Sequence, residues 1–131
     1  MIQYGKDLMP ITDVCLNVTE ACNLNCRYCF TEHHPHMMSL EVAKDAAIWL
    51  HENAILATQI TGNPVIPTIG FFGGEPTLCW DSVIVPLVEW IEELEWQFNF
   101  GITSNCVLMD KEKVDFLCEH KIGLLLSMDG D

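Results

Sequence analysis

Three cysteines near the start of the chain have a spacing that suits metal chemistry. Cys22, Cys26 and Cys29 lie within eight residues, in a C-x3-C-x2-C pattern. Three thiolates this close along the chain can converge on one small inorganic core. A 4Fe-4S cluster has four corners, so three cysteines would hold three irons and leave the fourth iron open to a substrate or cofactor.

Zinc is the alternative metal for the same residues. A C-x2-C pair is also half of a zinc knuckle, and a structural zinc site takes four protein ligands, so His33 or His34 would have to supply the fourth. A catalytic zinc with three cysteines and a water, or three buried thiols without a metal, would fit the same pattern. The spacing by itself leaves the iron-sulfur and zinc interpretations open.

The number of cysteines helps to predict the cellular compartment of the protein. The chain contains 7 cysteines, and its start lacks the apolar segment of a secretory signal. We therefore expect reduced thiols and a cytoplasmic location rather than a secreted disulfide scaffold. The four cysteines outside the motif are expected to be packing residues, with Cys15 and Cys118 in the core and Cys79 and Cys106 a few residues past strand ends.

Composition limits the class of partner. The chain has 131 residues, 50% of them hydrophobic, which suits one folded domain over residues 1–131. Lys and Arg number 6 against 19 Asp and Glu, so the formal net charge is −13. Such a charge repels phosphate backbones and anionic membrane surfaces, which argues against a nucleic-acid or membrane partner. No apolar run approaches the ~18 residues that a membrane-spanning helix needs.

The hydrophobic pattern alternates between strand and helix. Strands are expected at 11–18, 66–72, 98–104 and 122–127, and helices after Ser39 as N-cap, at 81–96 and at 110–120. This βαβαβαβ order predicts an α/β fold of parallel strands joined by helical crossovers, as a doubly wound sheet or a barrel. In both architectures, ligands gather at the carboxyl ends of the strands.

Polar or metal-binding residues follow every expected strand. They are the three cysteines, Gly73-Gly74-Glu75-Pro76, Thr103-Ser104-Asn105 and Ser127-Met128-Asp129-Gly130. Because parallel strands end at the same edge of a sheet, all four clusters should lie on one rim. No helix follows the fourth expected strand, so the outer strands would be open edges. We therefore expect the chain to be the N-terminal part of a larger fold.

These motifs resemble the signature of the radical S-adenosylmethionine (radical SAM) enzymes. The cysteine spacing, with Tyr28 just before the last cysteine, is similar to that family's cluster motif, and Gly73-Gly74-Glu75 stands where the family has its GGE motif. The polar ends of the third and fourth strands resemble the family's as well. The resemblance implies about four βα units of the family's six-unit partial (β/α) barrel, so residues 1–131 would form the N-terminal part of a radical SAM core domain.

The resemblance also implies roles for individual residues. Cys22, Cys26 and Cys29 would ligate three irons of a 4Fe-4S cluster, and the amino and carboxylate groups of SAM would chelate the fourth. Gly73 and Gly74 would let the backbone approach the methionine moiety of SAM. The other implied contacts are Glu75, or the carbonyls of its turn, to the methionine ammonium, Tyr28 to the adenine, and Ser104, Asn105 and Ser127 to the ribose hydroxyls or the carboxylate.

Within the family, the stretches 17–26, 38–43 and 71–81 look most like the peptide- and protein-modifying branch, which includes SPASM-type maturases and anaerobic sulfatase-maturing enzymes. The implied reaction is reductive cleavage of SAM to a 5′-deoxyadenosyl radical that abstracts hydrogen from a peptide or protein, with a flavodoxin- or ferredoxin-type reductant. Two alternatives stay open. One is a non-catalytic iron-sulfur or zinc-binding module, and the other is a radical SAM enzyme acting on a small molecule.

Overall fold

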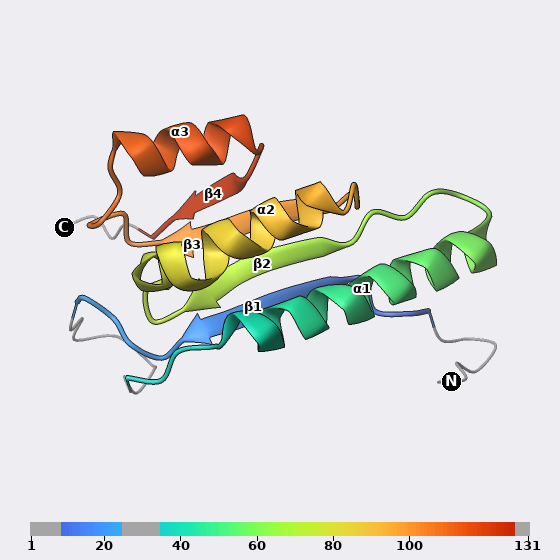
Figure 1. Cartoon of the computed structure of the whole chain (residues 1–131), viewed down its shortest axis with the longest axis horizontal. Coiled ribbons are helices and arrows are strands. Elements are labelled where there is room, and N and C mark those ends of the chain that lie inside the picture. The colour runs from blue at the N-terminus through green and yellow to red at the C-terminus, as the bar shows by residue number, and fades with distance from the viewer. Residues whose placement is uncertain (1–8, 25–34, 128–131) are drawn as a thin grey trace.

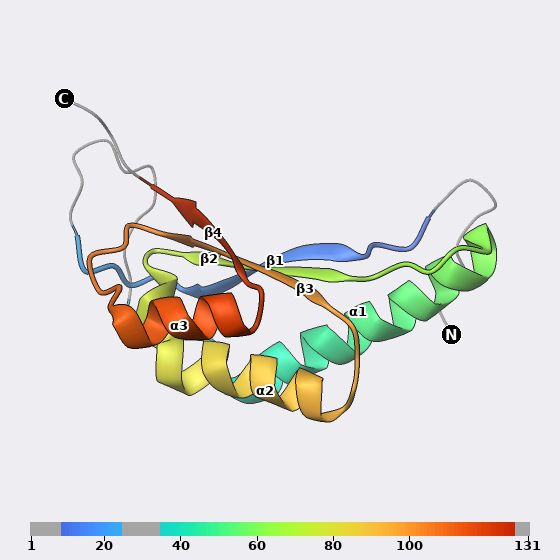
Figure 2. The same cartoon turned by 90° about the horizontal axis from the view of Figure 1, so that it is seen from above.

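The computed structural model describes residues 9–24 and 35–127 of the chain. In this part of the chain, one parallel sheet carries its helices on one face, as Figures 1 and 2 show. The α/β class and the alternating order expected from the sequence are confirmed. The elements are β1 (Asp13–Thr19), α1 (Leu40–Thr61), β2 (Thr68–Gly73), the helical turns η1 (Pro76–Cys79) and η2 (Trp80–Ile84), α2 (Val85–Glu93), β3 (Asn99–Ser104), α3 (Lys111–Glu119) and β4 (Gly123–Leu126).

The sheet has the strand order β1-β2-β3-β4, and each strand pairs in parallel with the next. All four strands therefore point their carboxyl ends the same way. The loops that follow them meet at one end of the sheet, which is the left-hand end in Figure 1. This is the rim on which the sequence places its polar clusters.

Helix α1 shows why its boundaries fall where they do. It begins after Ser39, as expected, because the Ser39 hydroxyl accepts a hydrogen bond from the backbone N–H of Val42 at 3.2 Å. It ends at Gly62, whose φ of 75° allows the left-handed conformation that closes a helix. The Gly62 N–H donates to the carbonyl of Thr58 at 2.9 Å.

The second helical segment differs from the regular helix expected over 81–96. Helical structure begins earlier, as the 3-10 turn η1, passes through the π-type turn η2, and becomes α2 only at Val85. Pro86 lies at the start of α2 and has no backbone N–H, so the regular α-helical hydrogen bonds cannot run through this position. The wider turn accommodates the proline, with the Val85 N–H reaching the carbonyl of Trp80.

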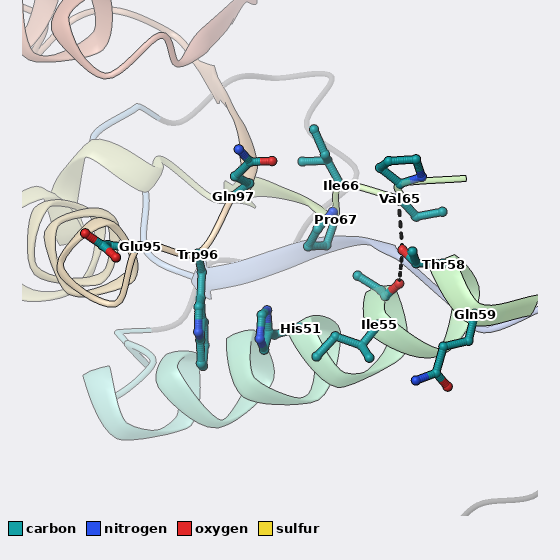
Figure 3. A pocket seen from close by; sticks show the side chains of 12 residues that line it. His51, Ile55, Thr58, Gln59, Val65, Ile66, Pro67, Glu95, Trp96 and Gln97 are labelled. Carbon is teal, nitrogen blue, oxygen red and sulfur yellow. Dashed lines mark hydrogen bonds between the residues drawn. The ribbon is translucent and has the colours of Figure 1, made fainter. Parts of the chain in front are cut away.

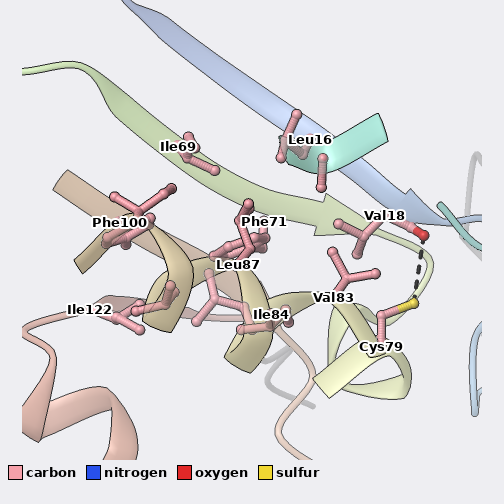
Figure 4. Close-up of a cluster of buried hydrophobic side chains, with 14 of the residues drawn as sticks. Leu16, Val18, Ile69, Phe71, Cys79, Val83, Ile84, Leu87, Phe100 and Ile122 are labelled. Carbon is pink, nitrogen blue, oxygen red and sulfur yellow. Dashed lines mark hydrogen bonds between the residues drawn. The ribbon is translucent and has the colours of Figure 1, made fainter. Parts of the chain in front are cut away.

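The core lies between the sheet and its helices (Figure 4). Alternate strand residues such as Leu16, Val18, Ile69 and Phe71 point to this face, and Leu87 meets them from α2. Because strand side chains alternate between faces, the remaining strand residues lie on the opposite face. No helix of the described residues covers that face, as Figure 2 shows from above.

Two cysteines expected in the core are instead exposed. Cys15 shares the open face of β1 with Asp13 and Asn17, because Leu16 and Val18 occupy the core-facing positions. Cys118 is exposed on α3, where Leu117 supplies the buried side chain. No helix in the described ranges is long and apolar enough to cross a membrane.

Candidate functional site

Backbone hydrogen bonds at the carboxyl ends of the strands join the segment after β1 to the turn after β2, and the end of β3 to the end of β4. The N–H of Gly74 donates to the carbonyl of Thr19 at 2.8 Å, and the N–H of Glu75 donates to the carbonyl of Ala21 at 2.9 Å. On the other side, the N–H of Ser127 donates to the carbonyl of Ser104 at 2.9 Å. The described parts of the four sequence motifs thus lie on one rim.

Both ends of the cysteine loop are anchored to β1. The Thr19 hydroxyl donates to the carbonyl of His36 at 2.9 Å and accepts from the N–H of Ala21 at 3.0 Å. The N–H of Met38 donates to the carbonyl of Val18 at 2.7 Å, and Thr19 forms an antiparallel bridge with Met37. The chain that leaves β1 at Ala21 therefore returns to the same strand end before α1 begins.

Gly73 and Gly74 are required by the packing of this turn. Gly73 has a φ of 145°, and a Cβ there would clash with the carbonyl of Thr19. A Cβ on Gly74 would clash with the carbonyl of Ala21. The expected contact of these glycines with a methionine moiety stays a prediction. Within the described residues, the backbone that approaches them closely is that of the chain leading to Cys22.

Glu75 is a buried carboxylate at the centre of the rim, with a relative exposure of 1%. Its Oε2 accepts hydrogen bonds from the N–H and hydroxyl of Thr77 and from the Ser104 hydroxyl at 2.8 Å. Its Oε1 accepts from the N–H of Asn105 at 2.9 Å. These bonds join the turn after β2 to the end of β3, so the carboxylate acts as a structural link. The sequence pointed to Glu75, but not to its partner Thr77, although a hydroxyl two residues after a helix cap is a local signal for such a contact.

Asn105 reaches across the rim to the cysteine loop. Its Nδ2 donates to Oδ1 of Asn23 at 2.8 Å and lies 3.9 Å from Sγ of Cys22. The N–H of Leu24 also donates to that sulfur, at 3.4 Å. Two N–H donors directed at one sulfur suit a thiolate ligand, so the chemistry around Cys22 fits an iron-sulfur site.

The other site residues expected from the sequence lie partly within and partly outside the described ranges. Cys26, Cys29 and Tyr28 lie outside the described residues. Ser104 is buried, donates its hydroxyl to Glu75 and accepts from the N–H of Cys106 at 2.9 Å, whereas Ser127 is exposed at the end of β4. Their expected SAM contacts stay predictions. Within residues 9–24 and 35–127, no three His, Cys, Asp or Glu side chains are grouped as a metal site.

Cys79, just past the GGE turn, is a core residue as expected. It is fully buried, and its thiol donates to the carbonyl of Val18 at 3.5 Å, the bond drawn in Figure 4. Burial raises the pKa of the Cys79 thiol, which keeps it protonated. Cys106 is half-buried on the rim, with a φ of 62°.

A separate hollow lies at the amino ends of the strands, far along the sheet from the rim (Figure 3). It has a volume of about 490 Å³ and is bordered by α1 and by the segments that lead into β2 and β3. The rings of His51 and Trp96 stack on its wall with centroids 3.9 Å apart. Ligands of parallel α/β sheets gather at the other ends of the strands, so this hollow is not the candidate site.

Comparison with curated proteins gives three informative relatives. The chain is 27% identical to the radical SAM cyclopropyl synthase TigE of Paramaledivibacter caminithermalis over 137 residues, covering 98% of this chain and 28% of that protein. It is 30% identical to molybdenum cofactor biosynthesis protein 1 of Dictyostelium discoideum over 111 residues, covering 85% and 16%. It is 29% identical to GTP 3′,8-cyclase of Staphylococcus aureus over 121 residues, covering 85% and 32%. The chain thus spans about a third or less of these proteins.

Among solved structures, the fold is similar to native anSMEcpe with bound AdoMet and Cp18Cys peptide. The TM-score is 0.70 at 26% identity, covering 93% of this chain and 32% of that one. The four-stranded parallel sheet therefore matches part of a radical SAM barrel, which confirms the expected architecture. A model of the Radical SAM superfamily matches residues 16–130, most of the chain. The chain belongs to the radical SAM superfamily.

Proposed function

We propose that this chain forms the cluster- and SAM-binding part of a radical SAM enzyme that acts on a peptide or protein. The observation that carries the proposal is the network on the rim, in which Glu75 after β2 holds the backbone of Asn105 after β3, and the Asn105 side chain reaches Cys22 after β1. A packing thiol needs no such support, whereas a thiolate ligand is stabilised by N–H donors.

Cys22, with Cys26 and Cys29, would hold a 4Fe-4S cluster in this proposal. When bound, such a cluster would supply the electron for reductive cleavage of SAM, the chemistry that would lead to hydrogen abstraction from the substrate. The chain's own residues position the ligand loop. The close packing at Gly73 and Gly74 holds the loop against the end of β2, and this rigidity limits how far Cys22 can move.

The rim also narrows the choice of SAM contacts. The Glu75 carboxylate already accepts four hydrogen bonds, so the backbone carbonyls of its turn are the better acceptors for the methionine ammonium. The Ser104 hydroxyl is buried and already bonded to Glu75. The Asn105 amide is likewise bonded, to Asn23 and to the N–H of Val107. We therefore assign the ribose or carboxylate contacts of SAM first to Ser127, which is exposed just after β4.

A peptide substrate is supported over a nucleotide. The similar anSMEcpe structure holds a peptide, while the name of GTP 3′,8-cyclase points to a nucleotide substrate for that relative. With a net charge of −13 and only 6 Lys and Arg in total, this chain is a poor partner for a triphosphate. A flavodoxin- or ferredoxin-type protein is the proposed source of electrons.

Anaerobic reconstitution with iron and sulfide tests the proposal. We expect a brown protein with about four irons per chain, the count of a 4Fe-4S cluster, and release of 5′-deoxyadenosine from SAM when dithionite is added. Cys22→Ala should lose the colour and the release, whereas the matched variant Cys118→Ala, on an exposed helix position, should keep both.

The same preparation separates the alternatives. A colourless protein that holds one zinc would reject the iron-sulfur assignment. A brown protein that binds SAM without cleaving it would point to a non-catalytic module. If 5′-deoxyadenosine release rises with GTP and not with a peptide mixture, the small-molecule alternative would replace the peptide substrate.

A further inference from the structure

Three glycines and one cysteine form a straight row across the open face of the sheet. Cys15 of β1 pairs in register with Gly70 of β2, Gly70 pairs with Gly101 of β3, and Gly101 pairs with Gly123 of β4. The buried strand residues Ile69, Phe71 and Ile102 alternate with these positions, so the row lies on the opposite face of the sheet, which no described helix covers (Figure 2). Every strand thus presents its backbone or a small side chain at the same level of the sheet.

Nothing within the described chain requires these glycines. None of the three has a positive φ. A Cβ on Gly101 would meet only the carbonyl of Gly123, at 3.7 Å, and a Cβ on Gly123 would meet only the carbonyl of Phe100, at 3.8 Å, both ordinary contacts. Glycine inside a strand weakens it, and it often marks a place where a ligand or another backbone approaches closely.

The row forms the floor of a shallow hollow of about 320 Å³. Its wall toward the rim is formed by the next residues on the same face, Phe72, Thr103 and Leu125. Leu125 is 66% exposed and Phe72 is 40% exposed, so large apolar surfaces stand beside the empty row. None of the residues that line the hollow carries a charge.

We propose that this glycine row is a substrate subsite that receives one uncharged, apolar side chain of the peptide. The inference rests on the proposed function, since it names what part of the peptide enters. Two observations favour this occupant. The uncharged lining selects against charged groups, which would lose hydration without gaining a partner. The hollow also lies next to the rim, because its residues Phe72 and Thr103 are the last open-face positions before β2 ends at Gly73 and β3 ends at Ser104.

The size of the hollow agrees with one side chain. Its volume is at the lower end of the range of small-ligand pockets, roughly 300–1,000 Å³. Since the three glycines have no side chains, they set the depth of the subsite. A larger residue at Gly101 would fill the centre of the floor, between Gly70 of β2 and Gly123 of β4.

Cys15 provides a direct test, because its exposed thiol lies beside the row. A Cβ on Gly70 would be 3.4 Å from its Sγ. Small disulfides with different tails can exchange reversibly with this thiol, so that the mixed disulfide forms and a free thiol leaves. We would compare isobutyl and benzyl tails with hydroxyethyl and guanidinium tails, and measure capture at each cysteine by peptide mapping. Cys118, exposed on α3, is the internal reference.

Capture at Cys15, relative to Cys118, should be about tenfold higher for the apolar tails than for the hydroxyethyl tail, as expected for burial of a small apolar group. Gly101→Leu should remove this preference. The matched variant Asn99→Leu adds the same side chain to the same face of β3, outside the hollow, and should keep it. Urea unfolding of both variants checks that the sheet is intact.

Equal capture of all tails, or a preference that survives Gly101→Leu, would overturn the proposal. A preference that disappears as protein concentration rises would assign the face to a second copy of the chain instead. The assay needs neither cluster nor SAM. Failure of the subsite and failure of the proposed function can therefore be told apart. If Cys15 captures the apolar tails selectively but the protein does not release 5′-deoxyadenosine from SAM, the proposed function is rejected. A substrate is then rejected as the occupant of the subsite as well.

Discussion

At the scale of single residues, the rim depends on side chains that hold other side chains. Glu75 resembles a ligand-binding residue in the sequence, yet its carboxylate is buried and bonded to Thr77, Ser104 and Asn105. Asn105 in turn donates toward Cys22. The position of Cys22, a candidate ligand after β1, thus depends on a carboxylate that follows the next strand, β2.

Glu75→Gln should destabilise the protein. An amide presents two N–H donors where Thr77, Ser104 and Asn105 already donate, so at least one buried donor would lose its acceptor. The free energy of unfolding in urea should fall by about 1–3 kcal/mol. Glu89→Gln, on the exposed face of α2, makes the same chemical change and should have little effect. Equal effects of the two substitutions would contradict the role assigned to Glu75.

The buried thiol of Cys79 should make stability depend on alkaline pH. Burial raises its pKa in the folded state, so its contribution is fully present below the ordinary thiol pKa of about 8.5 and is lost as pH rises through the higher folded value. Between about pH 7 and pH 9.5, the protein should lose more unfolding free energy than Cys79→Ala does. Urea titrations at both pH values measure the difference. Parallel losses in the two proteins would show that this thiol does not contribute.

At the scale of elements, the critical contact is the one between the end of β1 and the turn after β2. Two backbone hydrogen bonds and two glycines let these segments lie against each other. The return of the chain at His36 to Met38 closes the cysteine loop on the same strand end. The loop that carries Cys22 is therefore supported by β1 on one side and by the GGE turn on the other.

Gly73→Ala should therefore lower the free energy of unfolding more than a comparable glycine substitution elsewhere. Gly62, the C-cap of α1, also has a positive φ, but a Cβ there would meet nothing within 4 Å. Gly62→Ala should cost only the backbone strain, about 1–2 kcal/mol. Gly73→Ala adds a clash with Thr19, so its unfolding free energy should fall further and iron uptake on reconstitution should drop. Similar iron uptake by the two variants would argue against a tight turn as a requirement for the ligand loop.

At the scale of the whole molecule, the one-sided sheet and the charge are the dominant features. The helices cover one face, while the other presents an uncharged hollow next to the rim. The formal net charge of −13 is spread over 131 residues, so repulsion between carboxylates opposes the compact state.

Moderate salt should therefore stabilise the folded chain. Raising NaCl from about 0.01 to about 0.15 M shortens the screening length from roughly 30 Å to roughly 8 Å, which weakens repulsion between distant carboxylates. We expect Tm to rise by a few degrees, measured by circular dichroism. Sucrose, which is uncharged, provides a control for general solvent effects. A Tm that is unchanged or lower in NaCl would mean that charge repulsion is a minor term.

Local patterns in the sequence were sufficient for the order of elements and for the rim. Strand and helix periodicities, the Ser39 cap and the clusters after each strand depend on residues close together in the chain, and parallel strands bring their ends to one edge. The π-type turn before Pro86 was not expected, because its form depends on how a proline is accommodated within a packed helix. Cys15 was misplaced because a short strand does not reveal which of its two faces will meet the helices.

Tertiary structure alone decided the contacts between strands. That the Glu75 carboxylate is occupied by Ser104 and Asn105, and that Asn105 reaches Cys22, depends on strand ends some 30 and 83 residues apart in sequence. The glycine row likewise appears only when the register of three strand pairs is known, since a shift of one residue would move each glycine to the other face. Sequence motifs pointed to the family of this protein, while register and packing determined which groups remain available to a ligand.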